Sequence, residues 1–466
     1  MIMKRQTHTV IWTMIVAGML LIASMQSRAN SGITLREAFA LAYKSNPAMR
    51  AAEAGYEATT EMKSQALSKF WQPQISVSGD VALERIDQKV NADLDTITHT
   101  DEKTVGLNID YPLFAGGQNQ AAGKVADYTI NAAEFSVDQT QQTLFLNVTH
   151  TFAAIQLTRK TLGFLQEEAK AAENLIRDNR NKLARKLATR VDVARAQQQL
   201  SAINVQIDQQ LGLLRAANHR FSIITGTRQQ PTDQWSALTE KRFSETDVIE
   251  RSLNNNPQLQ AQKASVEASK YFVKQNEGAL LPQLGLSYQA TYVKDAARYA
   301  SSGSFDELGY ETTQVVTLSV SVPLYLGGNT YSLVRQAKKK AVEAYYQMLD
   351  LQNAIVSGAY TAHTQLRTSQ KNIQQTAQDV SFAQAIIEGL QVQYRNRQVT
   401  VKDVIEARNT YLEARIQHQQ AFRRLLLSEA KLLSTMGILT LSYLDTGNDH
   451  KQQAIDRKSP SQYPPQ

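Results

Sequence analysis

The sequence predicts a mostly helical α+β protein made of two similar halves, each with a long antiparallel pair of helices and one β-hairpin. Three observations lead to this fold class. Short motifs recur in the same order in both halves of the chain. Two long tracts contain no proline, and apolar and polar residues alternate next to the prolines that flank those tracts.

One motif occurs twice, as YPLFAGG at 111–117 and as VPLYLGG at 322–328. Other pairs keep nearly the same spacing: Asn46-Pro47 and Asn256-Pro257, Pro73 and Pro282, TRVDV at 189–193 and TVKDV at 400–404, and Gly226 and Gly437. The spacing is far longer than the roughly 20 to 50 residues of a solenoid repeat, so it indicates a tandem duplication. The predicted halves are residues 30–226 and 251–440, joined by a linker at 227–250.

The N-terminal residues 1–29 have the pattern of a secretory signal peptide. Lys4 and Arg5 precede an apolar run at 10–23, and Ser27-Arg28-Ala29 has the small residues of a cleavage site. We therefore expect an exported chain that begins near Asn30. The sequence contains no cysteine, which excludes disulfides and a cysteine-borne lipid anchor. The net charge of +7 is small for 466 residues and does not favour a nucleic-acid partner.

Residues 113–230 and 324–459 contain no proline and are rich in Ala, Gln and Leu, which is typical of helices. Apolar residues spaced by three and four, beginning with Leu144 and Val148, predict coiled-coil-like packing. The first long helix is expected at about 118–184, which makes it roughly 100 Å long.

A capping box formed by Thr189 and Asp192 predicts that a new helix starts there and returns antiparallel to about Gly226. The first helix pair therefore spans 118–226. Thr400 and Asp403 form the same box in the second half, where the pair is expected at 328–437.

Alternating apolar and polar residues predict two strands in each half, in hairpins at about 73–112 and 282–323 with loops near 90–101 and 298–309. In an exported chain, such strands favour a transmembrane β-barrel. The alternative from the pattern alone is a soluble sandwich with one solvated face. Because four strands cannot close a bacterial barrel, several chains must pool their strands.

The repeated proline and glycine motif predicts the junction between barrel and helix. Pro112 and Pro323 lack the N–H that a central strand needs, and two glycine pairs allow the backbone to turn from sheet to helix: Gly116-Gly117 and Gly327-Gly328. Each Asn-Pro pair predicts the start of a helix that is about 25 residues long. The polar residues 441–466 are predicted to be disordered.

The sequence resembles the TolC family of outer-membrane efflux and secretion channels, the outer membrane factors. The resemblance consists of the duplicated halves, the Asn-Pro helix starts, P-L-F/Y-x-G-G after a second strand, T-x-x-D-V at the returning helix, and its closing glycine. The resemblance covers about 33–440. It implies a homotrimer with a shared twelve-stranded barrel in the outer membrane, continued by a twelve-helix tunnel through the periplasm.

The function implied by this resemblance is a passive exit duct of a tripartite efflux pump or a type I secretion system, gated at its periplasmic end. The implied partners are a periplasmic adaptor protein, an inner-membrane transporter and outer-membrane lipid, and no cofactor is implied. Cargo choice is expected to lie largely in the transporter and the adaptor.

The resemblance also implies a gate at the periplasmic tips of the tunnel. It assigns Asp403 and Glu406 to the constriction and Asp192 to the matching place in the first half. Tyr394 fits the position of a closed-state hydrogen bond toward that aspartate. From the residues alone, other roles stay open: both aspartates are capping-box carboxylates, and Glu406 can be a solvated helix charge.

The sequence departs from the family's pattern at Val399, where an arginine is frequent, and Arg397 is the nearest substitute. An enzyme is not predicted, because the seven histidines have no metal-ligand spacing and no phosphate-binding, dinucleotide or nucleophile motif occurs. The remaining alternative is a periplasmic coiled-coil scaffold or tether without a pore. The two amphipathic hairpins argue against it.

Overall fold

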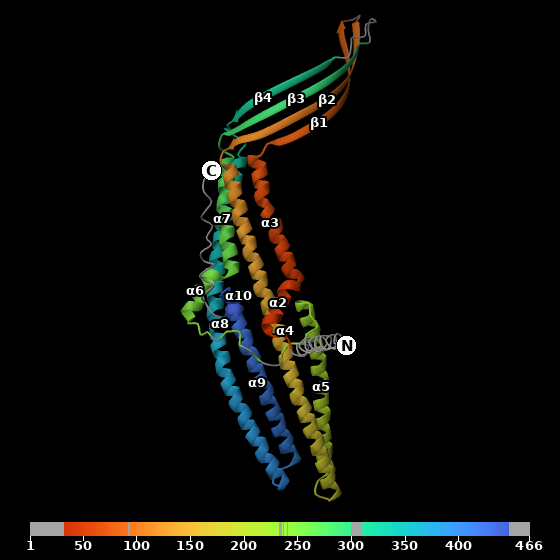
Figure 1. The fold of residues 1–466 in the computed structure, drawn as a ribbon, viewed down its shortest axis with the longest axis vertical. Helices are drawn as coiled ribbons and strands as arrows, with labels where there is room; N and C mark the ends of the chain where they lie inside the picture. The colour runs from red at the N-terminus through yellow and green to blue at the C-terminus, as the bar shows by residue number, and fades with distance from the viewer. Residues whose placement is uncertain are drawn as a thin grey trace, which may run out of the picture. The chain divides into compact units, whose positions relative to one another are not determined.

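A computed structural model describes residues 32–91, 94–232, 235, 237–239, 241–299, 309–325 and 327–446 (Figure 1). The predicted signal peptide and residues 447–466 of the predicted tail lie outside the described residues. The chain divides into two compact units. We call residues up to 53, 137–257 and from 352 onward the helical unit, and residues 54–136 and 258–351 the sheet unit.

Two long helix pairs account for most of the chain. α4 (Gln118–Ala184) and α5 (Arg190–Thr225) form the first pair, and α8 (Asn329–Arg395) and α9 (Val401–Thr435) form the second. The predicted limits of the first long helix are confirmed, and α4 and α8 each contain 67 residues. Among the described residues, no helix combines the length and apolar composition needed to cross a membrane.

Shorter helices precede the strands in both halves. α2 (Leu35–Ser45) and α3 (Pro47–Trp71) lie in the first half, and α6 (Glu245–Asn255) and α7 (Pro257–Gly278) in the second. The helices that start at the Asn-Pro pairs were predicted, whereas α2 and α6 were not. The predicted linker 227–250 contains the start of α6. The predicted disorder at 441–446 is wrong, because these residues form the short helix α10 (Leu441–Thr446).

The two Asn-Pro junctions make the same contact in each half. The side-chain amide of Asn46 donates to the carbonyl of Ile224 at 3.2 Å, and that of Asn256 donates to the carbonyl of Thr435 at 3.0 Å. The returning helices α5 and α9 end here at the predicted glycines, Gly226 and Gly437, both in the left-handed conformation. Each returning helix therefore ends against the junction of two short helices.

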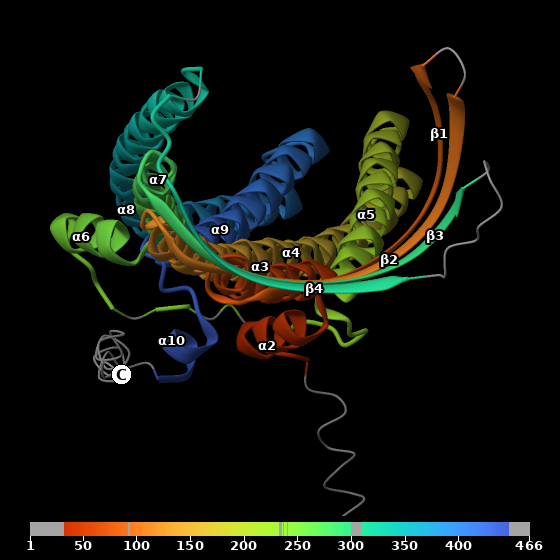
Figure 2. The ribbon, with the colours of Figure 1, turned by 90° about the horizontal axis from the view of Figure 1, so that it is seen from above.

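The core of the helical unit joins α2 to the long helices. The Phe39 ring stacks on Phe145 with 4.5 Å between ring centroids, and Phe152 meets Phe221 edge-on at 6.2 Å. All four side chains are almost fully buried, so each contributes about 3 to 5 kcal/mol relative to alanine. This packing holds α4 and α5 together and attaches α2 to one side of them (Figure 2).

The sheet unit holds four antiparallel strands in the order β1-β2-β3-β4: β1 (Gln74–Asn91), β2 (Leu94–Ala115), β3 (Gln283–Tyr299) and β4 (Tyr310–Ser321). Both hairpins are confirmed, and β2 pairs with β3 so that they form one sheet. The predicted loop at 90–101 is wrong, since β1 and β2 pair across it. Its polar threonines and aspartates resemble a loop, but the hydrogen-bonded register extends through them.

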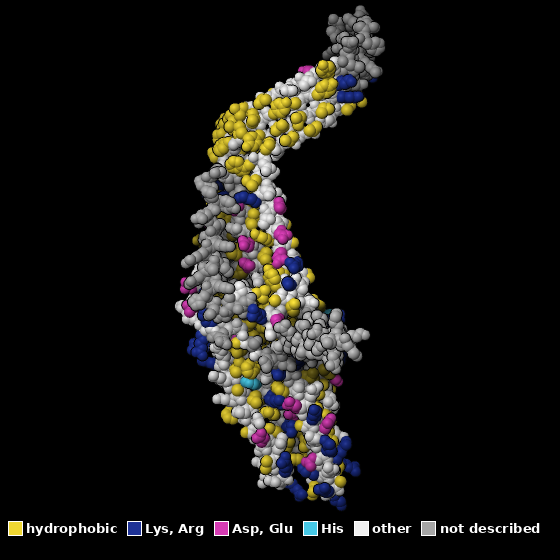
Figure 3. Space-filling view, in the orientation of Figure 1, with side chains coloured by type: hydrophobic (Ala, Val, Ile, Leu, Met, Phe, Trp, Pro, Cys, Tyr) yellow, Lys and Arg dark blue, Asp and Glu magenta, His cyan; other side chains and the backbone are white. Residues whose placement is uncertain are grey.

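The sheet has one apolar and one polar face, as predicted. One row across the strands contains Ile75, Ile109, Tyr288 and Val316, and the next row contains Ser76, Asn108, Gln289 and one apolar residue, Val315 of β4. The apolar side chains are not covered by the rest of the chain: Val77 is 73% exposed and Val316 69%. Apolar side chains accordingly cover the strands in Figure 3.

The two sheet-to-helix junctions differ in one respect. β4 ends before Pro323 as predicted, but β2 continues through Pro112 to Ala115, so the prediction that Pro112 ends its strand is wrong. The pairing with β3 is irregular between Pro112 and Phe114, which is how a strand accommodates a residue without an N–H. Both glycine pairs, at 116–117 and 327–328, have positive φ as the turn into α4 and α8 requires.

Candidate functional site

The turns that connect each long helix to its returning helix have the same backbone form. After α4, the N–H of Leu187 donates to the carbonyl of Lys182 at 2.7 Å, and the N–H of Lys186 donates to that of Leu183 at 2.9 Å. After α8, the same two bonds join Gln398 to Gln393 and Arg397 to Tyr394. This is a Schellman helix end, in which one residue must be left-handed.

That left-handed residue is Lys186 in the first turn and Arg397 in the second, with φ of 61° and 64°. Among the described residues, these are the only non-glycine residues with positive φ. A left-handed L-residue costs about 1 to 2 kcal/mol, and glycine is usual here. Both side chains are exposed cations beside a helix C-terminus, where the helix dipole favours positive charge.

Asp192 and Asp403 each close a capping box at the start of a returning helix. Asp192 Oδ2 accepts from the backbone N–H of Thr189 at 2.8 Å and from its hydroxyl at 2.7 Å. Asp403 Oδ2 accepts from the N–H and hydroxyl of Thr400, both at 2.7 Å. The predicted capping role is confirmed for both aspartates. In each, the second carboxylate oxygen is not part of the box.

The hydrogen bonds from Thr400 hold the pKa of the Asp403 carboxyl below its usual value, so this half-exposed group is charged at neutral pH. One turn later, Glu406 is exposed and lies 3.4 Å from the ammonium of Lys402. This contact is a surface pair within one helix and contributes little to stability. Two carboxylates are therefore present at the tip of α9.

Tyr394 connects the two helix pairs near these turns. Its hydroxyl donates to Asn179 Oδ1 of α4 at 2.9 Å, and the ammonium of Lys182 lies 3.7 Å from its ring centroid. Asn179 is fully buried. The bond predicted toward Asp192 is thus made to Asn179 instead. Asn179 lies on the face of α4 that meets α8, whereas the Asp192 carboxylate is bound in its capping box.

Lys182 also forms an ion pair with Asp178 at 2.9 Å, one turn back on α4. Burial disfavours its charged form, but hydrogen bonds to Asp178 and Tyr394 outweigh this effect and raise the pKa of Lys182. The Lys182 ammonium over the Tyr394 ring is therefore charged at neutral pH. Such a contact contributes about 0.5 to 2 kcal/mol to holding α4 against α8.

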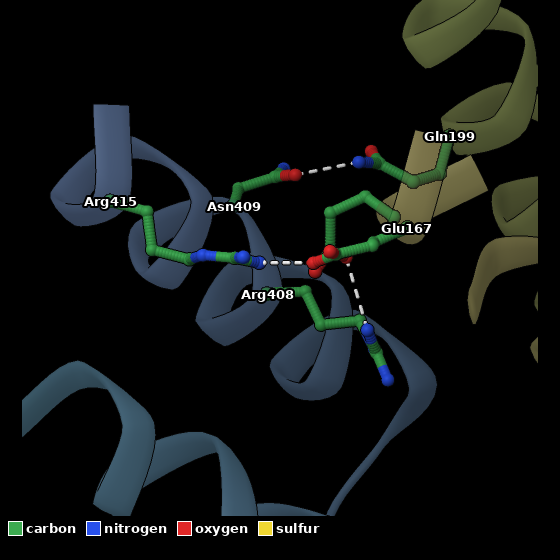
Figure 4. Close-up of polar contacts among 6 residues, drawn as sticks. Glu167, Gln199, Arg408, Asn409 and Arg415 are labelled. Carbon is green, nitrogen blue, oxygen red and sulfur yellow. Dashed lines mark hydrogen bonds and ion pairs between the residues drawn. The ribbon is translucent and has the colours of Figure 1, made fainter. Parts of the chain in front are cut away.

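Further from the tips, a network of charged and amide side chains joins the first helix pair to α9 (Figure 4). Its direct contacts are Arg408 to Glu168 at 3.0 Å, Arg415 to Glu167 at 2.7 Å, and Gln199 to Asn409 at 2.6 Å. We call these three contacts, together with Tyr394–Asn179, the inter-pair network. It was not predicted, because charges on long helices do not reveal which helix faces meet.

The two ion pairs of the inter-pair network differ in burial. Glu168 is only 6% exposed, so removal of Arg408 would leave a buried charge without its partner. Glu167 is exposed, and Arg415 also lies 3.8 Å from the Phe164 ring centroid. Removal of Arg415 therefore leaves no buried charge without a partner, and its cost in folding stability is mainly that of the cation–π contact, about 0.5 to 2 kcal/mol. Within the described residues, no group of acidic or histidine side chains is arranged to hold a metal ion.

Comparison with known proteins identifies the family. The sequence profile described as "Outer membrane efflux protein" matches residues 39–227 and again residues 248–438. The chain belongs to the outer membrane efflux protein family. Both matches include a long helix pair with its turn and its capping box, and together they contain all the residues of the inter-pair network.

Three relatives illustrate the range of this family. Outer membrane efflux protein BepC of Brucella suis is 23% identical over 411 residues, covering 88% of this chain and 87% of BepC. Outer membrane protein TolC of Vibrio cholerae is 23% identical over 395 residues, covering 83% and 86%. Alkaline protease secretion protein AprF of Pseudomonas aeruginosa is 23% identical over 311 residues, covering 65% and 62%.

Solved structures of outer-membrane channels have the same fold. The crystal structure of the Campylobacter jejuni CmeC outer membrane channel superposes with a TM-score of 0.74 at 18% sequence identity. The superposition covers 92% of each chain. The predicted resemblance to outer-membrane efflux and secretion channels is therefore confirmed.

Proposed function

We propose that the protein is the exit duct of an outer-membrane efflux or secretion system, a passive conduit that is gated at the periplasmic tips of its helix pairs. The observation that carries this proposal is a four-stranded sheet with an exposed apolar face and two free edges, in a chain of this family. Nothing in the proposal requires an enzymatic activity or a cofactor.

The sheet supports a homotrimer with a shared twelve-stranded barrel. Within the described residues, β1 and β4 each pair on one side only, so both edges are open to another chain. Three copies of four strands exceed the eight or so that a barrel needs. Along β3 the apolar face extends from Leu284 to Tyr292, or about 27 Å of strand. This length is close to the apolar band of about 25 Å in outer-membrane barrels.

Several observations support an internal duplication, with repeats at 30–226 and 251–440. The family profile matches twice. The left-handed turn residues, the capping boxes and the Asn amide contacts also recur at matching positions. A trimer of duplicated chains gives a tunnel of twelve long helices.

The inter-pair network supports a closed resting gate. To widen a tunnel at its tips, the α8/α9 pair must move away from the α4/α5 pair, and every contact of the network crosses that boundary. In the trimer we assign Asp192, Asp403 and Glu406 to the constriction. The capping of both aspartates leaves one carboxylate oxygen of each outside the box.

The proposed partners are a periplasmic adaptor protein and an inner-membrane transporter. Lys186 and Arg397 give each turn an exposed cation, and the turns are the natural docking point for an adaptor at the end of the tunnel. The apolar sheet face is assigned to outer-membrane lipid. BepC is named as an efflux protein and AprF as a protease secretion protein, and these names support efflux and protein export as the transport processes. Drug, protein and metal remain the candidate cargoes.

The test is the assembly state and conductance of the purified full-length protein. Native mass measurement in detergent is expected to give three subunits, and insertion into planar lipid bilayers is expected to give discrete channel currents. A stable monomer with a folded sheet and no conductance would contradict the proposal. That outcome would favour the alternative, a periplasmic scaffold without a pore.

A further inference from the structure

A cavity of about 580 Å³ lies in the helical unit between α4, α5 and α9. Five of its lining residues belong to α4 and four to α5, and Arg423 projects into it from α9. The α5 wall holds Leu213 and two alanines next to Arg220, so it combines apolar surface with a cation. No acidic side chain lines the cavity.

Two positively charged side chains, Arg220 and Arg423, line this cavity, and no carboxylate in the lining compensates them. Among the described residues, neither Arg220 nor Arg423 forms an ion pair, and the buried Nε of Arg423 has no hydrogen-bond partner. Burial, and then the charges of Arg423 and Arg220, lower the pKa of His150, which also lines the cavity. His150 is therefore neutral at pH 7, and the guanidinium groups alone give the cavity its charge.

The cavity opens on the side of α4 that faces away from α2. Phe145 and Phe152 point from α4 into the core around α2, and Gln156 binds the backbone carbonyl of Thr232 on the same side. With about 100° between successive helical residues, the cavity residues Asn147, Ala154 and Thr158 point in roughly the opposite direction. In Figure 2 α2 lies outside the arc formed by α8, α9, α4 and α5, so the cavity faces the inside of that arc.

We propose that this cavity is a binding site for organic anions, in which Arg220 and Arg423 hold the acidic group of the ligand and Leu213 contacts its apolar body. Guanidinium groups form bidentate, charge-assisted hydrogen bonds with carboxylate, sulfonate or phosphate groups. The volume lies within the range of roughly 300 to 1,000 Å³ that small-molecule sites occupy. The position of the site in the lumen of a duct rests on the proposed function, but anion binding itself does not.

The test compares a matched anion and cation. Naphthalene-2-sulfonate and naphthalen-2-ylmethylammonium are titrated by calorimetry into the full-length protein in lipid nanodiscs. We expect saturable binding of the sulfonate, and binding of the ammonium compound at least tenfold weaker. The double variant Arg220→Gln with Arg423→Gln should bind the sulfonate at least tenfold more weakly than the unchanged protein.

The control variant is Arg215→Gln with Arg424→Gln. It removes the same charge from the same two helices, at exposed positions outside the cavity lining. It should bind the sulfonate like the unchanged protein, and thermal unfolding verifies that both variants are folded. If the double variant Arg220→Lys with Arg423→Lys retains most of the affinity for the sulfonate, the glutamine variant binds weakly because it lacks the two positive charges. Equal affinity for anion and cation, or equal loss in both glutamine variants, overturns the inference.

Channel recordings separate this inference from the proposed function. If the site faces the lumen, the sulfonate should reduce the current of the unchanged channel more than that of the Arg220→Gln, Arg423→Gln variant. A conducting trimer that does not bind the sulfonate overturns the inference and leaves the proposed function intact. Selective binding by a protein that forms no channel supports the site and contradicts the proposed function.

Discussion

Gly116 and Gly327 occupy matching positions at the sheet-to-helix junctions, but their surroundings differ. Both have positive φ, at 61° and 62°. A Cβ on Gly116 would collide with the carbonyl of Gly278, whereas a Cβ on Gly327 would have no atom within 4 Å. The motif predicted the backbone conformation of both glycines. It could not predict the close approach at Gly116, which depends on the end of α7.

Gly116→Ala is therefore expected to destabilise the protein more than Gly327→Ala. Gly327→Ala carries only the left-handed strain of about 1 to 2 kcal/mol. Gly116→Ala adds an overpacking cost of about 1 to 3 kcal/mol, because backbone has to move. Chemical denaturation of the two variants measures the difference. Equal destabilisation would show that the contact with Gly278 is not a constraint.

Glu429 is a buried carboxyl on α9 that was not predicted as a special residue. Its carboxylate accepts the N–H of Leu238 at 2.8 Å, and the side chain is only 4% exposed. Burial raises the pKa of Glu429 from 4.5 to about 7, and the hydrogen bond from Leu238 only partly opposes this shift. The folded state thus favours the protonated side chain.

The raised pKa predicts a loss of stability with rising pH. The contribution of Glu429 to the free energy of unfolding is fully present below pH 4.5, and it is lost as the pH rises through about 7. Glu429→Gln keeps an acceptor for Leu238 without the charge, so its advantage in unfolding free energy should grow between pH 5 and pH 8, to at most about 3 kcal/mol. Thermal unfolding at the two pH values measures this. Glu413→Gln, exposed on the same helix, is the control, and an equal pH trend in both variants would refute the assignment.

At the scale of elements, local signals predicted helices and caps better than strand lengths. The capping boxes of α5 and α9 were readable because their residues are three apart in the sequence. The box of α2, Thr34 with Glu37, carries the same signal and was missed. The extension of β2 to Leu94 could not be predicted from the sequence, because the pairing of a polar stretch depends on its partner strand.

The tip of α9 carries the prediction about ion selectivity. If Asp403 and Glu406 surround one constriction in a trimer, up to six carboxylates should favour cations and bind trivalent cations across the ring. Asp403→Asn with Glu406→Gln should weaken both cation selectivity and trivalent block in planar bilayers.

The control is Asp247→Asn, which alters the capping box of α6 away from the tips. It should leave selectivity and block unchanged, and the trimer yield of both variants has to be measured alongside the current. If the tip variant keeps full selectivity and full block, these carboxylates act only as caps and surface charges.

At the scale of the whole molecule, the sequence motifs were sufficient to predict the family, because duplicated halves, caps and glycines follow one another in a fixed order. The inter-pair network was not predictable in the same way. Its partners lie far apart in the sequence, as Glu168 and Arg408 do, and their meeting depends on how each long helix is rotated. The capping boxes at the turns were therefore predicted, but the contacts along the helices were not.

The central claim is that the duct stays closed while the inter-pair network is intact. Tyr394→Phe with Arg415→Gln removes two of its contacts. It leaves the buried Arg408–Glu168 pair in place, so the variant should still fold. Because the chain has no cysteine, added cysteine pairs can be cross-linked selectively. The pair Gln199→Cys with Asn409→Cys joins one helix pair to the other, because Gln199 lies on α5 and Asn409 on α9. The pair Thr376→Cys with His418→Cys joins α8 to α9, which belong to the same helix pair.

The most direct measurement is the single-channel conductance of the Tyr394→Phe, Arg415→Gln variant in planar lipid bilayers. It should exceed that of the unchanged trimer by at least about twofold, since weaker links let the pairs separate. A short cross-linker at positions 199 and 409 should return the conductance to its resting value, and the same cross-linker at 376 and 418 should not. Gating by the inter-pair network would be contradicted if the variant forms a folded trimer whose conductance is unchanged. It would also be contradicted if both cross-links reduce the conductance of the variant equally.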